Sequence, residues 1–189
     1  MAKNKRDDIM EAALILFAER GYDGTTVPMI AEKAKVGAGT IYRYFENKES
    51  LVNSLFQMYI GKFSDMLKSS LDEHSTDFRQ QFHLLFQQMV QFAEQNEHAL
   101  PFIDSHSAGH YLDEKSVQMF EEFLDFLRAF ASNGTKQGLL CSLQPTAIIS
   151  IVYGAFAHLY KMIRLGVIEG KPALLDQVEE CCWNAIRIY

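Results

Sequence analysis

The sequence has few cysteines, few prolines and no long uninterrupted apolar run. The three cysteines are Cys141, Cys181 and Cys182, and their odd number and lack of CxxC spacing argue against a disulfide framework or a zinc knuckle. The longest apolar run, residues 147–160, is interrupted by polar residues and is expected to be too short and too polar to span a bilayer. Acidic residues soon follow the basic N-terminus, unlike in a signal peptide, so we expect a cytoplasmic protein with no membrane partner.

An excess of positive charge is also missing. The chain has 18 Lys and Arg residues against 24 Asp and Glu residues, which gives a net charge of -6. This balance excludes a protein that coats nucleic acid by bulk positive charge. The first 50 residues nevertheless hold 8 basic and 8 acidic side chains, so residues 51–189 carry the whole acidic excess. A small DNA site remains compatible with the neutral N-terminal segment.

The sequence does contain a strong helical periodicity. Almost no segment alternates with period two, whereas apolar residues recur every three to four positions in many segments, which predicts an all-α fold of about nine helices. We expect Gly21 to end the first helix, Asn47 to cap the fourth, and Gly134 to adopt a left-handed conformation at a helix C-terminus. The expected helices cover approximately residues 9–20, 26–34, 38–45, 48–71, 78–95, 100–107, 116–136, 144–165 and 172–188.

The most informative stretch is residues 21–51. It contains two short predicted helices around a tight turn, with the small Ala31 at the helix crossing and Ile41 on the inner face of the second helix. That layout is typical of a helix-turn-helix, whose second helix enters the major groove of DNA. Through LFAERGYDGTTV, IAEKAKV, GTIYRYF and NKESLV, in this order, the chain resembles the tetracycline-repressor (TetR/AcrR) family of transcriptional regulators.

The resemblance implies a domain organisation and a set of DNA contacts. Residues 1–50 would form a three-helix DNA-binding domain, and residues 51–189 a helical domain for effector binding and dimerisation. Hydroxyls and backbone N–H groups at a helix N-terminus bind phosphates, and side chains in the major groove read base edges. The residues carried over to these roles are Thr25, Thr26, Ala38, Gly39, Thr40, Tyr42, Arg43, Tyr44 and Lys48.

The individual roles follow from residue chemistry. Tyr42 would donate its hydroxyl to a phosphate, Arg43 would read guanine or bind the backbone, and Lys48 would neutralise a flanking phosphate. Gly39 would let the backbone approach DNA closely, and the Tyr44 ring would either join this surface or pack inward.

Three positions in this stretch depart from the family pattern. Lys35 stands where the turn usually has glycine, and an L residue in a left-handed conformation is strained by about 1 kcal/mol. Gly37 replaces the usual serine cap of the recognition helix, and Ala38 replaces a common lysine, which removes one cationic contact.

The acidic remainder is rich in aromatic residues at helical spacing. Core packing explains many of them, but the resemblance implies an effector pocket that some of them line. Because these helix faces carry few charges, we expect an apolar or aromatic effector. The candidate ligand-binding residues are Phe56, Phe92, Phe102, Phe123, Phe156 and Tyr160. His106 and His110 have metal-ligand spacing but lack an evident third ligand, so we predict no metal site and no cofactor.

The last two predicted helices are apolar over much of their surface. The resemblance implies that they pair with a second copy, although burial within one chain is the alternative. A homodimer would place two recognition helices about 34–36 Å apart on a pseudo-palindromic operator.

We therefore predict a ligand-responsive transcriptional regulator. It would act as a repressor that binds double-stranded operator DNA and is released by a small-molecule effector. A helical protein-interaction adaptor is one alternative. A cysteine-dependent enzyme built on Cys141 is another, although no catalytic motif supports it, and we expect no enzymatic activity.

Overall fold

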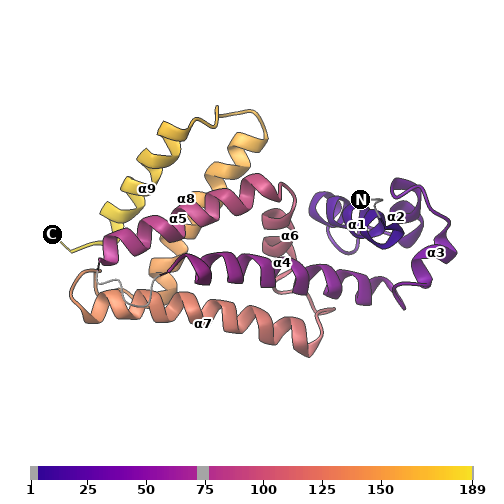
Figure 1. The fold of residues 1–189 in the computed structure, drawn as a ribbon, viewed down its shortest axis with the longest axis horizontal. Helices are drawn as coiled ribbons and strands as arrows, with labels where there is room; N and C mark the ends of the chain where they lie inside the picture. The colour runs from indigo at the N-terminus through magenta and orange to yellow at the C-terminus, as the bar shows by residue number, and fades with distance from the viewer. Residues whose placement is uncertain (1–3, 72–76, 189) are drawn as a thin grey trace. The chain divides into compact units, whose positions relative to one another are not determined.

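The computed structural model describes residues 4–71 and 77–188, and these residues form nine α-helices (Figure 1). Within the described residues the only strand-like pairing is an isolated bridge between Leu140 and Arg187, so the predicted all-α class is confirmed. The helices are α1 (Lys5–Arg20), α2 (Val27–Lys33), α3 (Ala38–Tyr42), α4 (Lys48–Ser70), α5 (Phe78–Gln95), α6 (Ala99–His106), α7 (Glu114–Lys136), α8 (Pro145–Arg164) and α9 (Pro172–Ile186).

Local sequence signals set most helix ends. Gly21 ends α1 with a φ of 68°, and its N–H donates to the Phe17 carbonyl oxygen, as expected of a glycine C-cap. Asn47 begins α4 through a reciprocal cap, because its Oδ1 accepts from the Ser50 N–H at 2.7 Å and its own N–H donates to Ser50 Oγ at 3.2 Å. The expected cap at Asn47 is therefore confirmed, whereas α3 ends at Tyr42, earlier than expected.

The chain forms two compact units. The first combines Met1–Ser64 with Ala93–Glu121, and in it α1 packs on α2 and on α6. Phe17 of α1 is fully buried, and its ring lies 6.2 Å from the ring of Phe102 of α6, centroid to centroid. Helices α1 to α3 thus form an N-terminal head whose core continues onto α6.

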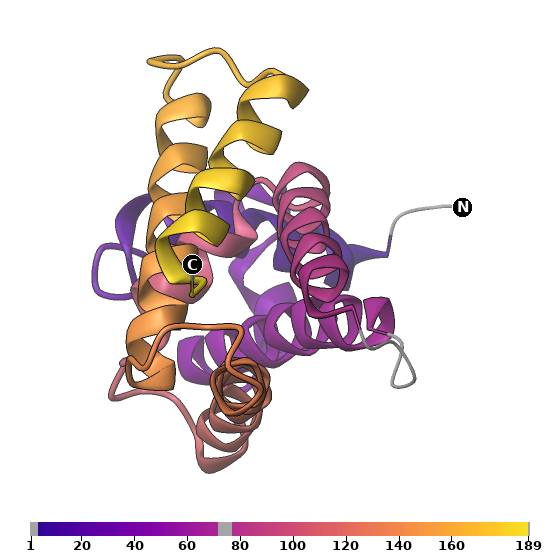
Figure 2. The same ribbon diagram turned by 90° about the vertical axis from the view of Figure 1, so that its left-hand side faces the viewer.

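The second unit combines Asp65–Phe92 with Glu122–Tyr189. Here α8 and α9 pack beside each other and are joined by the loop at residues 165–171 (Figure 2). Trp183 of α9 packs against Phe78 and Phe82 of α5, with ring centroids 6.3 and 5.3 Å apart. Two turns of α5 therefore hold the C-terminal end of α9.

Two expectations for this unit need correction. Gly134 lies inside α7, and the left-handed residue after this helix is Gly138, with a φ of 71°. A Cβ on Gly134 would lie 2.5 Å from Phe78 and 2.7 Å from Leu140, so close packing requires this glycine. Among the described residues, α8 is also long and apolar enough to cross a bilayer by length and composition alone, contrary to the expectation that its apolar run is too short and too polar.

Candidate DNA-binding site

Helices α2 and α3 and the turn between them form the helix-turn-helix. The apolar side chains of Ile30, Ala31 and Ile41 are buried, so both short helices are fixed from their inner faces. Lys35 has a φ of 54°, and the following N–H, of Val36, donates to the Ala31 carbonyl oxygen at 2.9 Å. The left-handed turn predicted at Lys35 is thus present despite the missing glycine.

The outer face of α3 is exposed. Tyr42 is 56% exposed and Tyr44 is 41% exposed, so the Tyr44 ring does not pack inward, whereas the neighbouring Phe45 is buried. Arg43, Ala38 and Gly39 are also exposed, and Thr40 is half-buried. A Cβ on Gly39 would meet no protein atom within 4 Å, so the fold itself leaves this position open.

The two threonines before α2 have different environments. Thr26 is exposed and caps α2, because its Oγ accepts from the Met29 N–H at 3.5 Å. Thr25 is fully buried, and its hydroxyl lies 2.8 Å from the Gly21 carbonyl oxygen and 3.1 Å from that of Leu16. The expectation that the Thr25 hydroxyl binds a phosphate is corrected, because these carbonyls already accept its only proton.

Lys48 also has an intramolecular role that the sequence did not indicate. Its ammonium donates to the carbonyl oxygens of Tyr22 at 2.9 Å and Thr25 at 3.0 Å. It also lies 3.8 Å from the centroid of the Tyr22 ring, within cation–π range. Lys48 therefore ties the first turn of α4 to the connection between α1 and α2, and its main contacts are within the protein.

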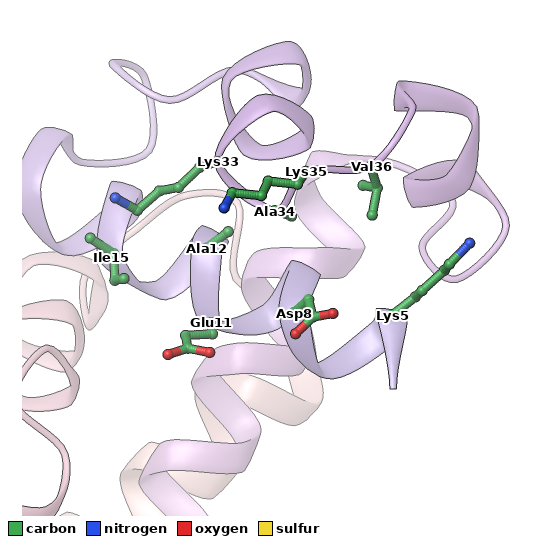
Figure 3. Close-up of a pocket in the computed structure, with 9 residues that line it drawn as sticks. All are labelled: Lys5, Asp8, Glu11, Ala12, Ile15, Lys33, Ala34, Lys35 and Val36. Carbon is green, nitrogen blue, oxygen red and sulfur yellow. The ribbon is translucent and has the colours of Figure 1, made fainter. Parts of the chain in front are cut away.

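A pocket of about 550 Å³ lies between α1 and the end of α2 (Figure 3). Lys5, Asp8 and Glu11 line it from α1, and Lys33 and Lys35 line it from the other side. The charge of the lining is therefore mixed, with three lysines and two carboxylates. A second pocket, of about 460 Å³, lies between α1, α4 and residues 95–98.

The six predicted ligand-binding residues line neither of these pockets. Phe56 and Phe102 form a ring pair with centroids 6.3 Å apart in the first unit, and Phe156 and Tyr160 form another at 6.0 Å in the second. Five of the six are buried, and Tyr160 is half-buried. In this conformation they form the protein core, and their role towards an effector stays a prediction.

The two histidines with metal-ligand spacing lie in different environments. His110 is exposed, whereas His106 is fully buried against the rings of Phe17 and Phe102. Nδ1 of His106 lies 2.9 Å from the Phe102 carbonyl oxygen, and burial lowers the pKa of this imidazole below its usual value. Folding of the first unit therefore favours the neutral form of His106.

The three cysteines lie in different environments. Cys182 is buried, and burial raises the pKa of its thiol to about 11, so it is a thiol at neutral pH. Cys181 is exposed and Cys141 is half-buried.

Comparison with known protein families covers nearly the whole chain. Residues 9–55 match the family described as bacterial regulatory proteins of the tetR family, and residues 56–188 match the tetracyclin repressor-like C-terminal domain. The HTH-type transcriptional regulator YhgD of Bacillus subtilis is 26% identical over 155 residues, which cover 80% of this chain and 81% of that protein.

One further sequence match and one solved structure extend the comparison. The fatty acid metabolism regulator protein of Bacillus subtilis is 41% identical over 68 residues, which cover 36% of this chain and 35% of that protein. The solved structure of the regulator FadR from Bacillus subtilis in complex with stearoyl-CoA has the same fold, with a TM-score of 0.68 and 23% identity. That match covers 93% of this chain and 96% of FadR.

These matches confirm the predicted family and function and do not favour the protein-interaction adaptor. The family consists of transcriptional regulators, which bind operator DNA and small-molecule effectors. The chain belongs to the TetR family of bacterial DNA-binding transcriptional regulators.

Proposed function

We propose that this repressor reads its operator through α3 and the N-terminus of α2, and that residues 1–50 are the functional DNA-binding domain. The observation that carries this proposal is the exposure of Tyr42 at the end of α3, and of Arg43 and Tyr44 directly after it. The buried Ile41 fixes the opposite side of the helix. Thr26, which is exposed and caps α2, Thr40 and Gly39 are the other members of the proposed surface. Such a rigid, partly cationic surface suits contacts to phosphates and base edges.

Tyr42→Ala tests this assignment. The probe is a duplex selected from a random DNA pool by the wild-type protein, and the measurement is its affinity by fluorescence anisotropy. The substitution is expected to weaken binding by about tenfold, the effect of a lost contact of about 1–2 kcal/mol. Tyr59→Ala is the matched control, because Tyr59 lies on α4 outside the proposed surface. Unchanged affinity of a folded Tyr42→Ala protein would show that the DNA surface is misassigned.

We further propose that the effector is apolar and that residues 51–189 bind it. The six predicted ring residues give each of the two units apolar side chains in its interior, and the fold is shared with a regulator solved with stearoyl-CoA. A long acyl chain suits an apolar protein interior, because each buried methylene contributes about 0.8 kcal/mol.

The effector is tested with stearoyl-CoA itself, titrated into the complex of the protein with its selected duplex. Release of the duplex is expected with stearoyl-CoA and is not expected with coenzyme A alone. Myristoyl-CoA and octanoyl-CoA provide a chain-length series, in which a shorter chain should release less DNA. No release by any member of the series would contradict an acyl effector.

The proposed assembly is a homodimer through α8 and α9. Exposed apolar residues on this pair include Ile151 of α8 and Leu165, Val167 and Ile168 of the connecting loop. A second copy that covers this surface would account for the apolar character of α8 without a membrane. We place the protein in the cytoplasm, where its DNA partner lies, and we assign it no catalytic activity.

A further inference from the structure

Three side chains from distant parts of the first unit form one continuous stack. The Tyr22 ring, between α1 and α2, lies parallel to the Tyr111 ring, with centroids 3.8 Å apart and an interplanar angle of 17°. The Lys48 ammonium lies 3.8 Å from the centroid of the same Tyr22 ring. The loop before α7, the head and the start of α4 therefore meet at Tyr22.

Tyr111 is held in place from α4 by Asn53. Nδ2 of Asn53, which is 5% exposed, donates to the carbonyl oxygens of Tyr111 at 2.8 Å and Glu49 at 2.9 Å. Its Oδ1 accepts from the Asp113 N–H at 2.9 Å and the Ser116 hydroxyl at 2.7 Å. All four hydrogen-bonding positions of this buried amide are filled, so it fixes the loop in a single register.

The stack contacts the segment that precedes α2, the first helix of the helix-turn-helix. Lys48 donates to the carbonyl oxygens of Tyr22 and Thr25, and the next residue, Thr26, caps α2. Removal of the Tyr111 ring would expose one face of Tyr22, and the connection between α1 and α2 would lose one of its supports. The helix-turn-helix would then occupy a wider range of orientations.

We infer that Tyr111 is a positioning residue for operator binding, held by Asn53 and acting through Tyr22 and Lys48. It touches no DNA in this role and instead limits the orientations that the head adopts before binding. A protein whose binding-competent orientation is only partly populated binds more weakly in proportion to that population. The inference rests on DNA binding by the head, which Tyr42→Ala tests separately.

Tyr111→Leu and Tyr111→Phe form the central pair of variants. The leucine removes the flat ring but keeps apolar bulk, whereas the phenylalanine keeps the stack. With the duplex selected by the wild-type protein, Tyr111→Leu is expected to bind about tenfold more weakly, and Tyr111→Phe within about twofold of wild type. Tyr59→Leu is the matched control for loss of a half-buried tyrosine elsewhere in the first unit. Circular dichroism confirms that each variant is folded at the assay temperature.

The salt dependence of binding separates positioning from the loss of a DNA contact. Positioning changes only the fraction of the free protein that is competent to bind, so the plot of log affinity against log salt for Tyr111→Leu should be parallel to that of wild type and displaced to weaker binding. A variant that loses a phosphate contact should instead give a shallower plot. Asn53→Ala is the second variant, and it should weaken binding in the same direction. If it acts through Tyr111, the double variant should bind little more weakly than Tyr111→Leu alone.

The outcomes distinguish the two proposals. If Tyr42→Ala weakens binding and Tyr111→Leu does not, the positioning role is overturned while the DNA surface stands. A shallower salt plot, or failure of Tyr111→Phe to restore affinity, also overturns the positioning role. If neither Tyr42→Ala nor Arg43→Ala weakens binding, the DNA surface itself is misassigned.

Discussion

Lys35 is the residue whose backbone departs most from the preference of its side chain. Its φ of 54° is the one left-handed conformation among the described non-glycine residues. Lys35→Gly should raise the free energy of unfolding by up to about 1 kcal/mol, because relief of strain exceeds the entropy that glycine adds to the unfolded chain. Urea denaturation followed by circular dichroism measures the change.

Lys33→Gly provides the control for Lys35. Lys33 is also exposed and lies in α2, where glycine lowers helix stability by about 1 kcal/mol. Both substitutions remove one lysine charge. If one raises the free energy of unfolding and the other lowers it, the difference comes from the backbone conformation and not from the charge. Destabilisation by both would contradict the strain at Lys35.

His106 should make the stability of the first unit depend on pH. Burial lowers the pKa of this imidazole, so the unfolded chain binds a proton at a higher pH than the folded one. The resulting stabilisation is complete above the unfolded pKa of about 6.5 and is lost as the pH falls through that value towards the folded pKa.

The free energy of unfolding should therefore fall between pH 7.5 and pH 5.5, and the fall should be smaller in His106→Gln. His110→Gln is the control, because His110 is exposed. Denaturant titrations at both pH values give the comparison. An equal loss of stability in wild type and His106→Gln would assign the pH dependence to other groups.

At the scale of helices, a buried carboxylate joins α9 to α5. Glu179 is 2% exposed, and its oxygens lie 2.7 Å from Arg79 Nη1 and 2.7 Å from His83 Nδ1, two residues one turn apart on α5. The Arg79 guanidinium also lies 5.4 Å from the centroid of the Trp183 ring. Polar and aromatic contacts therefore hold α9 at the same place.

Glu179→Gln should lower the free energy of unfolding by about 2 kcal/mol, because it keeps the shape of the side chain but removes the buried charge that pairs with the Arg79 guanidinium. The adjacent Glu180 also contacts Arg79, at 3.0 Å, but its side chain is 54% exposed. Glu180→Gln is accordingly expected to change stability little. Thermal unfolding of both variants tests this ranking, and equal effects would refute it.

At the scale of the whole molecule, the proposed dimer depends on the exposed side of α8. Ile151 is 37% exposed in the single chain. Ile151→Asp should convert a dimer to a monomer in sedimentation experiments, because an apolar interface disfavours an unpaired charge. The same variant should lose most of its affinity for a two-half-site duplex, since only linked heads bind both half-sites together.

Gln91→Asp adds the same charge to an exposed position of α5 and serves as the control. It should leave the sedimentation coefficient and the affinity unchanged. A monomeric wild-type protein would contradict the proposed dimer. If the Ile151→Asp protein is still a dimer, the interface does not include this part of α8.

The helices could be predicted because their signals are local. Residues 78–95 match the periodicity of α5 from end to end, and the ends at Gly21 and Asn47 follow from capping chemistry within a few residues. The sequence likewise determined the helix-turn-helix and the left-handed turn at Lys35. The expected left-handed conformation of Gly134 is wrong, because this glycine is needed for close packing against Phe78 and Leu140, which lie outside α7.

What the sequence by itself determined about this protein is its family, its helical fold and the outer surface of α3, since these depend on neighbours within one or two turns. Only the tertiary structure decided the contacts that Thr25, Lys48 and Tyr111 make within the protein. The first is buried, and the other two meet on Tyr22 from positions far apart in the chain. A threonine or lysine at a helix start has the same local pattern whether it faces DNA or its own protein, and packing alone distinguishes the two.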